Sequence, residues 1–312
     1  MRIVCADGEP QYYELLDAER IAAAGHELVW HDAVAGDDEL WVERLRGADA
    51  LALLWRLPPG VLRRSPSIRV VSFAGTGVET YVEMEEARER GIVVCNVPRY
   101  GTNAVAEHTV ALMLAVARRV PAGDRFVRQG GWGQQPGREL AGKRLGVVGA
   151  GPIAARVVEL GSALGMSVAA WTRSPSPERE RALGAPFVSL EHLFSSSDVV
   201  TIHVAGTVRG LVGADLLALL PQDAILVNTA RSAIVDEAAL ARLLDEGRLF
   251  GAGVDVFDPE PPPADHPLLR SERVVVTPHV GYHTPEASRE LVRVWIENLL
   301  AFARGEPQNV RP

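Results

Sequence analysis

The stretch Val147-Val-Gly-Ala-Gly-Pro-Ile-Ala154 decides the fold of this chain, because it joins a short apolar strand to a helix through a glycine turn. Gly149 permits the tight turn, and Gly151 lets the backbone approach a bound pyrophosphate closely. Pro152 begins the helix without an N–H group, so Ile153 N–H and the helix N-terminus remain to contact the ligand. We therefore expect a dinucleotide-binding strand–turn–helix unit here.

Short β-branched runs alternate with helical patterns along the rest of the chain, which favours parallel βαβ units. A helix expected over Ala104–Val120 separates two series of strands, and Gln129–Gly137 has the composition of a loop. The last helix is expected over Pro285–Arg304. The expected strands are Arg2–Cys5, Glu27–Trp30, Ala50–Leu54, Val70–Phe73 and Val93–Asn96 in the first series, then Arg144–Val148, Ser167–Trp171, Val199–Val204, Ala224–Asn228, Gly251–Val256 and Val274–Thr277 in the second.

This order of elements predicts an α/β protein with two parallel-sheet domains, Rossmann-like or flavodoxin-like, and a deep cleft between them. The first domain is expected to be discontinuous, formed by residues 1–98 plus 281–312, and to bind the substrate. Residues 99–280 are expected to form an NAD(P)-binding Rossmann domain inserted between its two parts. Hinges for closure of the cleft are expected near 97–101 and 280–284.

The composition narrows the class of protein. The 312 residues carry a net charge of −8 and no basic tract, which argues against nucleic acid as a partner. No apolar stretch is long enough to span a bilayer, and Met1–Cys5 is expected to be a first strand rather than a cleavable signal. We therefore expect a cytoplasmic protein that binds neither nucleic acid nor membrane. No cluster of metal-ligand residues stands out, so no metal is expected.

The end of the second Rossmann strand bears on the choice of cofactor. An acidic residue there would bind the ribose 2′-hydroxyl of NAD, whereas an arginine can accept the 2′-phosphate of NADP. The strand ends in Trp171-Thr172-Arg173-Ser174, with no carboxylate before Glu178. Because Arg173 offers a fixed charge in a planar fork and Ser174 a hydroxyl, the sequence favours NADP(H) over NAD(H). A solvated arginine that tolerates NAD is the alternative.

Three further motifs follow in the order Asn228-Thr-Ala-Arg231, Gly253-Val-Asp-Val-Phe-Asp-Pro-Glu260 and Thr277-Pro-His279. Together with the helical stretch Arg99–Val120, they resemble the signature blocks of the D-isomer-specific 2-hydroxyacid dehydrogenases. The resemblance covers essentially the whole chain, most strongly residues 92–283. It implies hydride transfer between NAD(P)H and a small 2-oxo acid, which yields the D-2-hydroxy acid.

The resemblance also implies a role for each catalytic residue. His279 is expected to protonate the ketone oxygen as general acid, while Glu260 hydrogen-bonds its other ring nitrogen and keeps the imidazolium available at neutral pH. Arg231 is expected to bind the substrate carboxylate and to polarise the carbonyl. Singly, each residue has an ordinary structural explanation, but together at the ends of expected strands they favour an active site. The further cofactor contacts expected are Thr172, Ser174, Val204, Thr229, Ala230 and Asp255, the last of which is expected to hold the nicotinamide carboxamide.

The residues expected to bind the substrate are indicated by weaker sequence patterns than the catalytic residues. The loop Ser72–Val78 resembles the one whose backbone amides face the substrate carboxylate in this family. The stretch Trp55-Arg-Leu-Pro-Pro59 resembles the glyoxylate/hydroxypyruvate reductase branch. Ser232 stands where this family commonly has glycine, and Tyr282-His283 stand where it often has small residues. Both departures indicate a modified substrate pocket. The substrate contacts expected are Trp55, Arg56, Gly75, Thr76, Gly77, Arg231 and Tyr282.

Two other functions stay open on this sequence. Arg56 would suit a phosphite- or phosphonate-type dehydrogenase on the same fold, because it adds a second cation. A dinucleotide-sensing protein like the corepressors of this scaffold would bind cofactor with little turnover. The family resemblance and the apolar helix Ala104–Val120 indicate a homodimer through the nucleotide domain, with a small 2-oxo or 2-hydroxy acid as the other partner.

Overall fold

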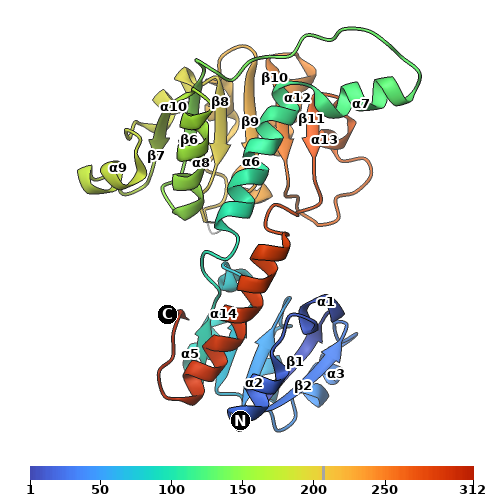
Figure 1. Cartoon of the computed structure of the whole chain (residues 1–312), viewed down its shortest axis with the longest axis vertical. Coiled ribbons are helices and arrows are strands. Elements are labelled where there is room, and N and C mark those ends of the chain that lie inside the picture. The colour runs from blue at the N-terminus through green and yellow to red at the C-terminus, as the bar shows by residue number, and fades with distance from the viewer. Residues whose placement is uncertain (206–207) are drawn as a thin grey trace. The chain divides into compact units, whose positions relative to one another are not determined.

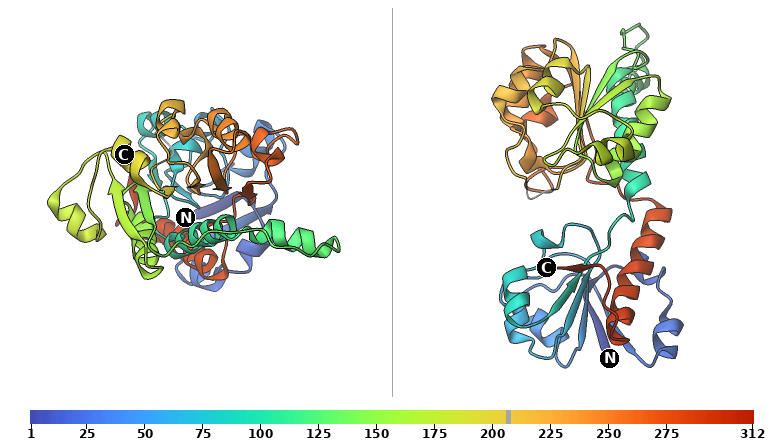
Figure 2. Two further views of the ribbon diagram at one scale, coloured as in Figure 1. Left: turned by 90° about the horizontal axis from the view of Figure 1, so that it is seen from above. Right: turned by 90° about the vertical axis from the view of Figure 1, so that its left-hand side faces the viewer.

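The computed structural model of the chain describes residues 1–205 and 208–312. Its two compact units consist of Met1–Tyr100 with Thr284–Pro312, and of Gly101–His283. Each unit contains a six-stranded sheet with helices on both faces, as the right-hand view of Figure 2 shows. The predicted pair of parallel-sheet α/β domains is therefore confirmed, whereas the cleft between them stays a prediction.

The first unit has the strand order β12-β5-β4-β3-β1-β2, in which only β12 runs antiparallel to its neighbour among the described strands. The long helix α14 packs on this sheet, where Trp295 Nε1 donates to Ser72 O at 2.7 Å (Figure 1). The strands are β1 Arg2–Gly8, β2 Glu27–Asp32, β3 Ala50–Leu53, β4 Val70–Phe73, β5 Val93–Cys95 and β12 Val310–Arg311. The helices are α1 Pro10–Tyr13, α2 Ala18–Ala23, α3 Asp38–Arg44, α4 Val61–Arg64, η1 Val78–Thr80, α5 Met84–Glu89 and α14 Pro285–Ala303.

The second unit has the order β11-β10-β9-β8-β6-β7, and its strands are parallel throughout. The order reverses between β6 and β8, the place where such sheets bind nucleotides. The strands are β6 Arg144–Val148, β7 Ser167–Trp171, β8 Val199–Ile202, β9 Ala224–Asn228, β10 Leu249–Val254 and β11 Val274–Val276. The helices are α6 Thr102–Ala117, α7 Val120–Arg128, α8 Pro152–Ala163, α9 Pro177–Leu183, α10 Leu190–Ser196, α11 Ala214–Ala218, η2 Ser232–Ile234, α12 Glu237–Asp245 and α13 Pro267–Arg270.

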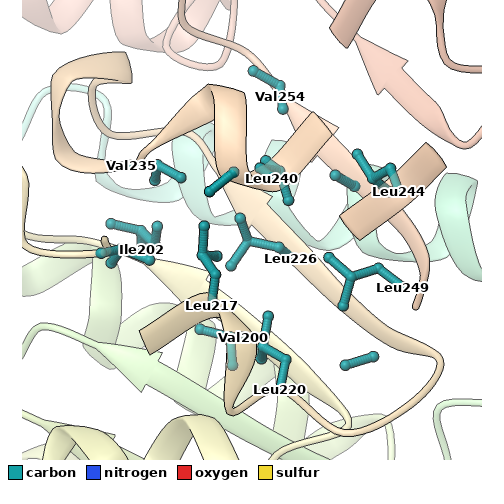
Figure 3. Close-up of a cluster of buried hydrophobic side chains, with 14 of the residues drawn as sticks. Val200, Ile202, Leu217, Leu220, Leu226, Val235, Leu240, Leu244, Leu249 and Val254 are labelled. Carbon is teal, nitrogen blue, oxygen red and sulfur yellow. The ribbon is translucent and has the colours of Figure 1, made fainter. Parts of the chain in front are cut away.

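A hydrophobic core fixes the strands that carry the candidate site. Figure 3 shows Leu217 of α11 and Leu240 and Leu244 of α12 gathered over Leu226 of β9, all of them fully or nearly fully buried. Burial of each such side chain stabilises the fold by about 1.5–3 kcal/mol. The core therefore holds β9 firmly, and with it the residues that follow its carboxyl end.

The structure corrects several predicted boundaries. The helix expected to run to Val120 ends at Ala117, because Arg119 adopts a left-handed conformation with φ 53° and a second helix, α7, begins there. β1 extends to Gly8, β8 ends at Ile202 and β10 begins at Leu249. The edge strand β12 was not expected at all, because two exposed residues carry no strand pattern. The stretch 129–137 contains no helix or strand, as predicted.

Candidate active site

The glycine turn after β6 has the shape that a dinucleotide requires. Gly149 has φ +129°, and a Cβ atom there would lie 2.3 Å from the carbonyl oxygen of His203. Around Gly151, a Cβ atom would meet no described heavy atom within 4 Å, so the backbone is open beside the N-terminus of α8. Only glycine suits the first position, and the open second position fits a pyrophosphate against the N–H groups that begin α8.

The end of β7 places Arg173 and Ser174 beside this turn, because β7 pairs with β6 through to Trp171. Both side chains are exposed, and the carbonyl of Ser174 accepts a hydrogen bond from Arg179 at 2.7 Å. The predicted contact Val204 directly follows His203 and is half-buried. These positions suit a nucleotide bound across the strand ends.

His279 and Glu260 form a close pair in the second unit. His279 Nδ1 lies 2.8 Å from Glu260 Oε2, while Glu260 Oε1 accepts the backbone N–H of Phe257 at 3.0 Å. Burial alone would raise the pKa of Glu260, but the hydrogen bonds from His279 and Phe257 N–H, together with the charges of His279 and Arg231, lower it below its ordinary value. Glu260 is therefore an ionised partner for the imidazole at neutral pH.

The backbone of His279 adopts a left-handed conformation with φ 53°, which is sparsely populated for residues other than glycine. The buried carboxylate of Asp255 holds the residues on either side of His279. It accepts hydrogen bonds from the Thr277 hydroxyl at 2.5 Å, Val280 N–H at 3.0 Å and Gly281 N–H at 2.9 Å. The contact of Asp255 with a nicotinamide stays a prediction, but its carboxylate fixes the loop that carries His279.

His108, on α6, extends this network. Its Nε2 lies 2.9 Å from the Thr277 hydroxyl and 3.4 Å from Asp255 Oδ1. Burial would raise the pKa of Asp255, yet the hydrogen bonds from His108, Thr277 and the two backbone N–H groups lower it below its ordinary value. From the sequence, His108 is expected to have a structural role, and Thr277 appears only as the first residue of the motif Thr277-Pro-His279. Both support the loop that bears His279.

Arg231 follows β9 and is positioned through Asn228. The Asn228 side chain accepts Ala230 N–H at 3.0 Å and donates to Arg231 O at 2.9 Å, which stabilises the turn between them. Arg231 is half-buried and acts electrostatically on Glu260, so the guanidinium belongs to the same site. Thr229, a predicted cofactor contact, has its hydroxyl 2.9 Å from that of Thr109. Asn228 belongs to the sequence motif, but its positioning role was not predicted.

Tyr282 also lies close to the pair. Its ring stands edge-on to that of His279, with 6.1 Å between the ring centroids. This position agrees with a side chain that shapes the surroundings of His279. A contact with substrate stays a prediction.

The predicted substrate residues of the first unit lie in the loops that follow β3 and β4. Asn96 Nδ2 donates to Thr76 O at 2.6 Å, and Val97 N–H donates to Gly75 O at 2.9 Å, which fixes the loop that contains Gly77. The exposed Arg56 donates to Thr80 O at 3.2 Å and thereby connects the loops after β3 and β4. Trp55 is exposed beside it.

Among the described residues, 1–205 and 208–312, no three His, Cys, Asp or Glu side chains gather in a way that could hold a metal ion. Nor does any helix in these ranges have both the length and the apolar character needed to cross a lipid bilayer.

Comparison with known proteins places the chain in a family. The sequence model described as "D-isomer specific 2-hydroxyacid dehydrogenase, NAD binding domain" matches residues 110–281. Glyoxylate reductase of Aeropyrum pernix is 41% identical over 296 residues, which cover 90% of this chain and 88% of that protein.

Solved structures agree with this match. A protein of Thermus thermophilus shares 36% identity and a TM-score of 0.89, with both chains covered completely. An NADPH-dependent glyoxylate/hydroxypyruvate reductase of Sinorhizobium meliloti, solved with citrate, shares 28% identity and a TM-score of 0.88 over 99% of this chain and 97% of its own. The chain therefore belongs to the D-isomer specific 2-hydroxyacid dehydrogenase family and is an oxidoreductase.

Proposed function

We propose that the chain reduces a small 2-oxo acid, of the glyoxylate or hydroxypyruvate kind, to the D-2-hydroxy acid. The observation that carries this proposal is the 2.8 Å contact between His279 Nδ1 and Glu260 Oε2, since it leaves Nε2 as the ring nitrogen that can serve a substrate. The names of the A. pernix relative and the S. meliloti structure, which both include reduction of glyoxylate, support the substrate class.

The chain's own residues suit a nicotinamide dinucleotide. Gly149, Gly151 and the N-terminus of α8, with Pro152 and Ile153, would hold the pyrophosphate. When bound, the reduced nicotinamide supplies the hydride that reaches the carbonyl carbon. The remaining contacts proposed for the cofactor are Thr172, Arg173, Ser174, Val204, Thr229, Ala230 and Asp255.

Three side chains would carry out the rest of the reaction. Arg231 binds the substrate carboxylate and polarises the neighbouring carbonyl with its fixed positive charge. His279 transfers the proton on Nε2 to the ketone oxygen as that oxygen becomes an alkoxide. Glu260 keeps the Nδ1 proton in place and stabilises the imidazolium before the transfer. The further substrate contacts that we propose are Trp55, Arg56, Gly75, Thr76 and Gly77 of the first unit and Tyr282 of the second.

Replacement of Glu260 by glutamine is expected to lower kcat for 2-oxo acid reduction roughly 10-fold or more, because His279 loses the anionic partner of its Nδ1 nitrogen. The measurement is the steady-state rate of 2-oxo acid reduction. Glu237→Gln is a matched control, since Glu237 contacts His266 at 3.1 Å in the same unit. An unchanged kcat in Glu260→Gln would contradict the role given to this carboxylate.

We further propose that NADP(H) is preferred over NAD(H), because the exposed Arg173 follows β7 and the S. meliloti structure is named NADPH-dependent. Arg173→Ala is expected to raise KM for NADPH by roughly 10-fold or more and to leave KM for NADH nearly unchanged, since only NADPH offers a phosphate to this side chain. Steady-state kinetics with both cofactors measures this. Equal losses for the two cofactors would place Arg173 elsewhere than on the 2′-phosphate.

We also propose a homodimer through the second unit. Figure 1 shows α7 (green) leading away from the sheet of that unit. Its Val120 and Val127 are 57% and 52% exposed, and Trp132 in the following loop is 90% exposed. Apolar side chains exposed to this degree along one segment suit an interface with a second copy. Sedimentation equilibrium of the chain measures its oligomeric state.

The test of the proposed activity is the initial rate of NADPH and NADH oxidation with glyoxylate, hydroxypyruvate, pyruvate and phenylpyruvate. Turnover of any of these acids supports the reductase. Cofactor binding without turnover across this panel would instead favour a dinucleotide sensor.

A further inference from the structure

Asp7 is a buried carboxylate that the proposed chemistry does not use. It lies in β1 with 0% of its surface exposed. It accepts hydrogen bonds from Leu54 N–H at 3.1 Å and from Trp55 N–H at 2.6 Å, both of which directly follow β3. In the strand order β5-β4-β3-β1-β2, the direction of winding reverses between β1 and β3. Asp7 therefore bridges the two strands at the point where open α/β sheets bind their ligands.

The charged form of Asp7 lowers the stability of the fold. Burial raises the pKa of Asp7 to about 6, and the N–H groups of Trp55 and Leu54 offset only part of that effect. Because the folded state binds the proton more tightly than the unfolded state, the free energy of unfolding falls as pH rises from about 4 to about 6 and stays lower above it. A carboxylate that weakens the fold at neutral pH calls for a functional reason.

The segment that Asp7 holds, Leu54–Leu57, is tied to the substrate loop of the first unit. Trp55 Nε1 donates to Glu9 Oε1 at 3.0 Å, so a second acid near the end of β1 holds the same residue. Arg56 donates to Thr80 O at 3.2 Å. Leu57 N–H donates to Tyr81 O at 3.1 Å. A shift of this segment would therefore reach the loop in which Thr76 and Gly77 lie.

We propose that Asp7 is a positioning residue whose carboxylate holds Leu54–Leu57 against the end of β1 and thereby sets the affinity for the 2-oxo acid. The inference rests on the proposed function, since it assigns Trp55 and Arg56 to the substrate. Asp7 acts on the substrate through backbone N–H groups of this segment. The residues proposed to transfer the proton and to bind the cofactor belong to the second unit. We therefore expect a change at Asp7 to leave kcat, the rate at saturating substrate, unaffected.

The experiment compares Asp7→Asn with Asp49→Asn. Asp49 is a matched control, because it also accepts a backbone N–H, that of Arg2 at 2.8 Å, next to β3 in the same sheet but at the opposite, amino end of the strand. In Asp7→Asn, an NH₂ group replaces one of the accepting oxygens. We expect KM for glyoxylate to rise about 10-fold, with kcat and the Kd for NADPH nearly unchanged. Tm at neutral pH is expected to equal or exceed the wild-type value, because the variant removes a buried charge. In Asp49→Asn, KM is expected to stay at the wild-type value.

Three outcomes would overturn the proposal: an unchanged KM in Asp7→Asn, an equal rise in Asp49→Asn, or an Asp7→Asn protein that unfolds, since the carboxylate would then be needed for the fold. Hydrogen exchange gives a reading that does not depend on turnover. We expect faster exchange in Asp7→Asn at residues 54–57 but not at 50–52, and equal exchange at 54–57 would also overturn the proposal. A wild-type chain that reduces none of the four acids would refute the proposed function alone, because exchange still reports on Asp7.

Discussion

Replacement of His279 by asparagine is expected to lower kcat for 2-oxo acid reduction by about 10²–10⁴, the usual contribution of a positioned proton donor. Asparagine can still donate to Glu260, whose Oε2 lies 2.8 Å from Nδ1 in the wild type, so the loop is expected to keep its conformation. Stopped-flow or steady-state measurement of NADPH oxidation gives the rate.

The control for this prediction is His192→Asn. His192 is exposed on α10 of the same unit, and its replacement is expected to leave kcat unchanged. NADPH binding, followed by its fluorescence, is expected to be retained in both variants, since the glycine turn after β6 is untouched. If His279→Asn kept most of the wild-type turnover, another group would have to be the proton donor.

Replacement of Arg231 by lysine is expected to lower kcat/KM by about 10²–10³, the usual loss when one preorganised donor to a developing oxyanion is removed. Lysine keeps the charge but loses the planar fork that binds a carboxylate with two parallel hydrogen bonds. The Asn228 side chain bonds to the backbone around Arg231 rather than to its guanidinium, so the turn is expected to survive the change.

Arg242→Lys on α12 is the matched control for Arg231→Lys, because Arg242 is exposed in the same unit. The inhibition constant of oxamate separates binding from chemistry, since oxamate resembles the 2-oxo acid but is not reduced. We expect it to rise in Arg231→Lys and to stay constant in Arg242→Lys. Unchanged oxamate inhibition together with unchanged kcat/KM would remove Arg231 from the site.

Most of the strands could be predicted because their signal is local. Val70–Phe73 and Ala224–Asn228 are short apolar runs, buried along their whole length, and both were predicted with the observed bounds. The glycine turn was equally readable, since φ +129° at Gly149 excludes other residues. The end of α6 was predicted too late, although the charged pair Arg118-Arg119 interrupts the apolar run and Pro121 stands in the first turn of α7. The left-handed backbone of Arg119, which separates the two helices, has no signal of its own in the sequence.

The sequence by itself determined the two sheets and the nucleotide turn, because periodicity and short motifs are properties of neighbouring residues. Its resemblance to a family indicated the three candidate catalytic residues. Only the tertiary structure decided which groups hold them. Asp255 bonds to Val280 across 25 positions, and Asp7 bonds to Trp55 across 48. A carboxylate chooses its partners by distance in the folded chain, and no local pattern encodes that distance.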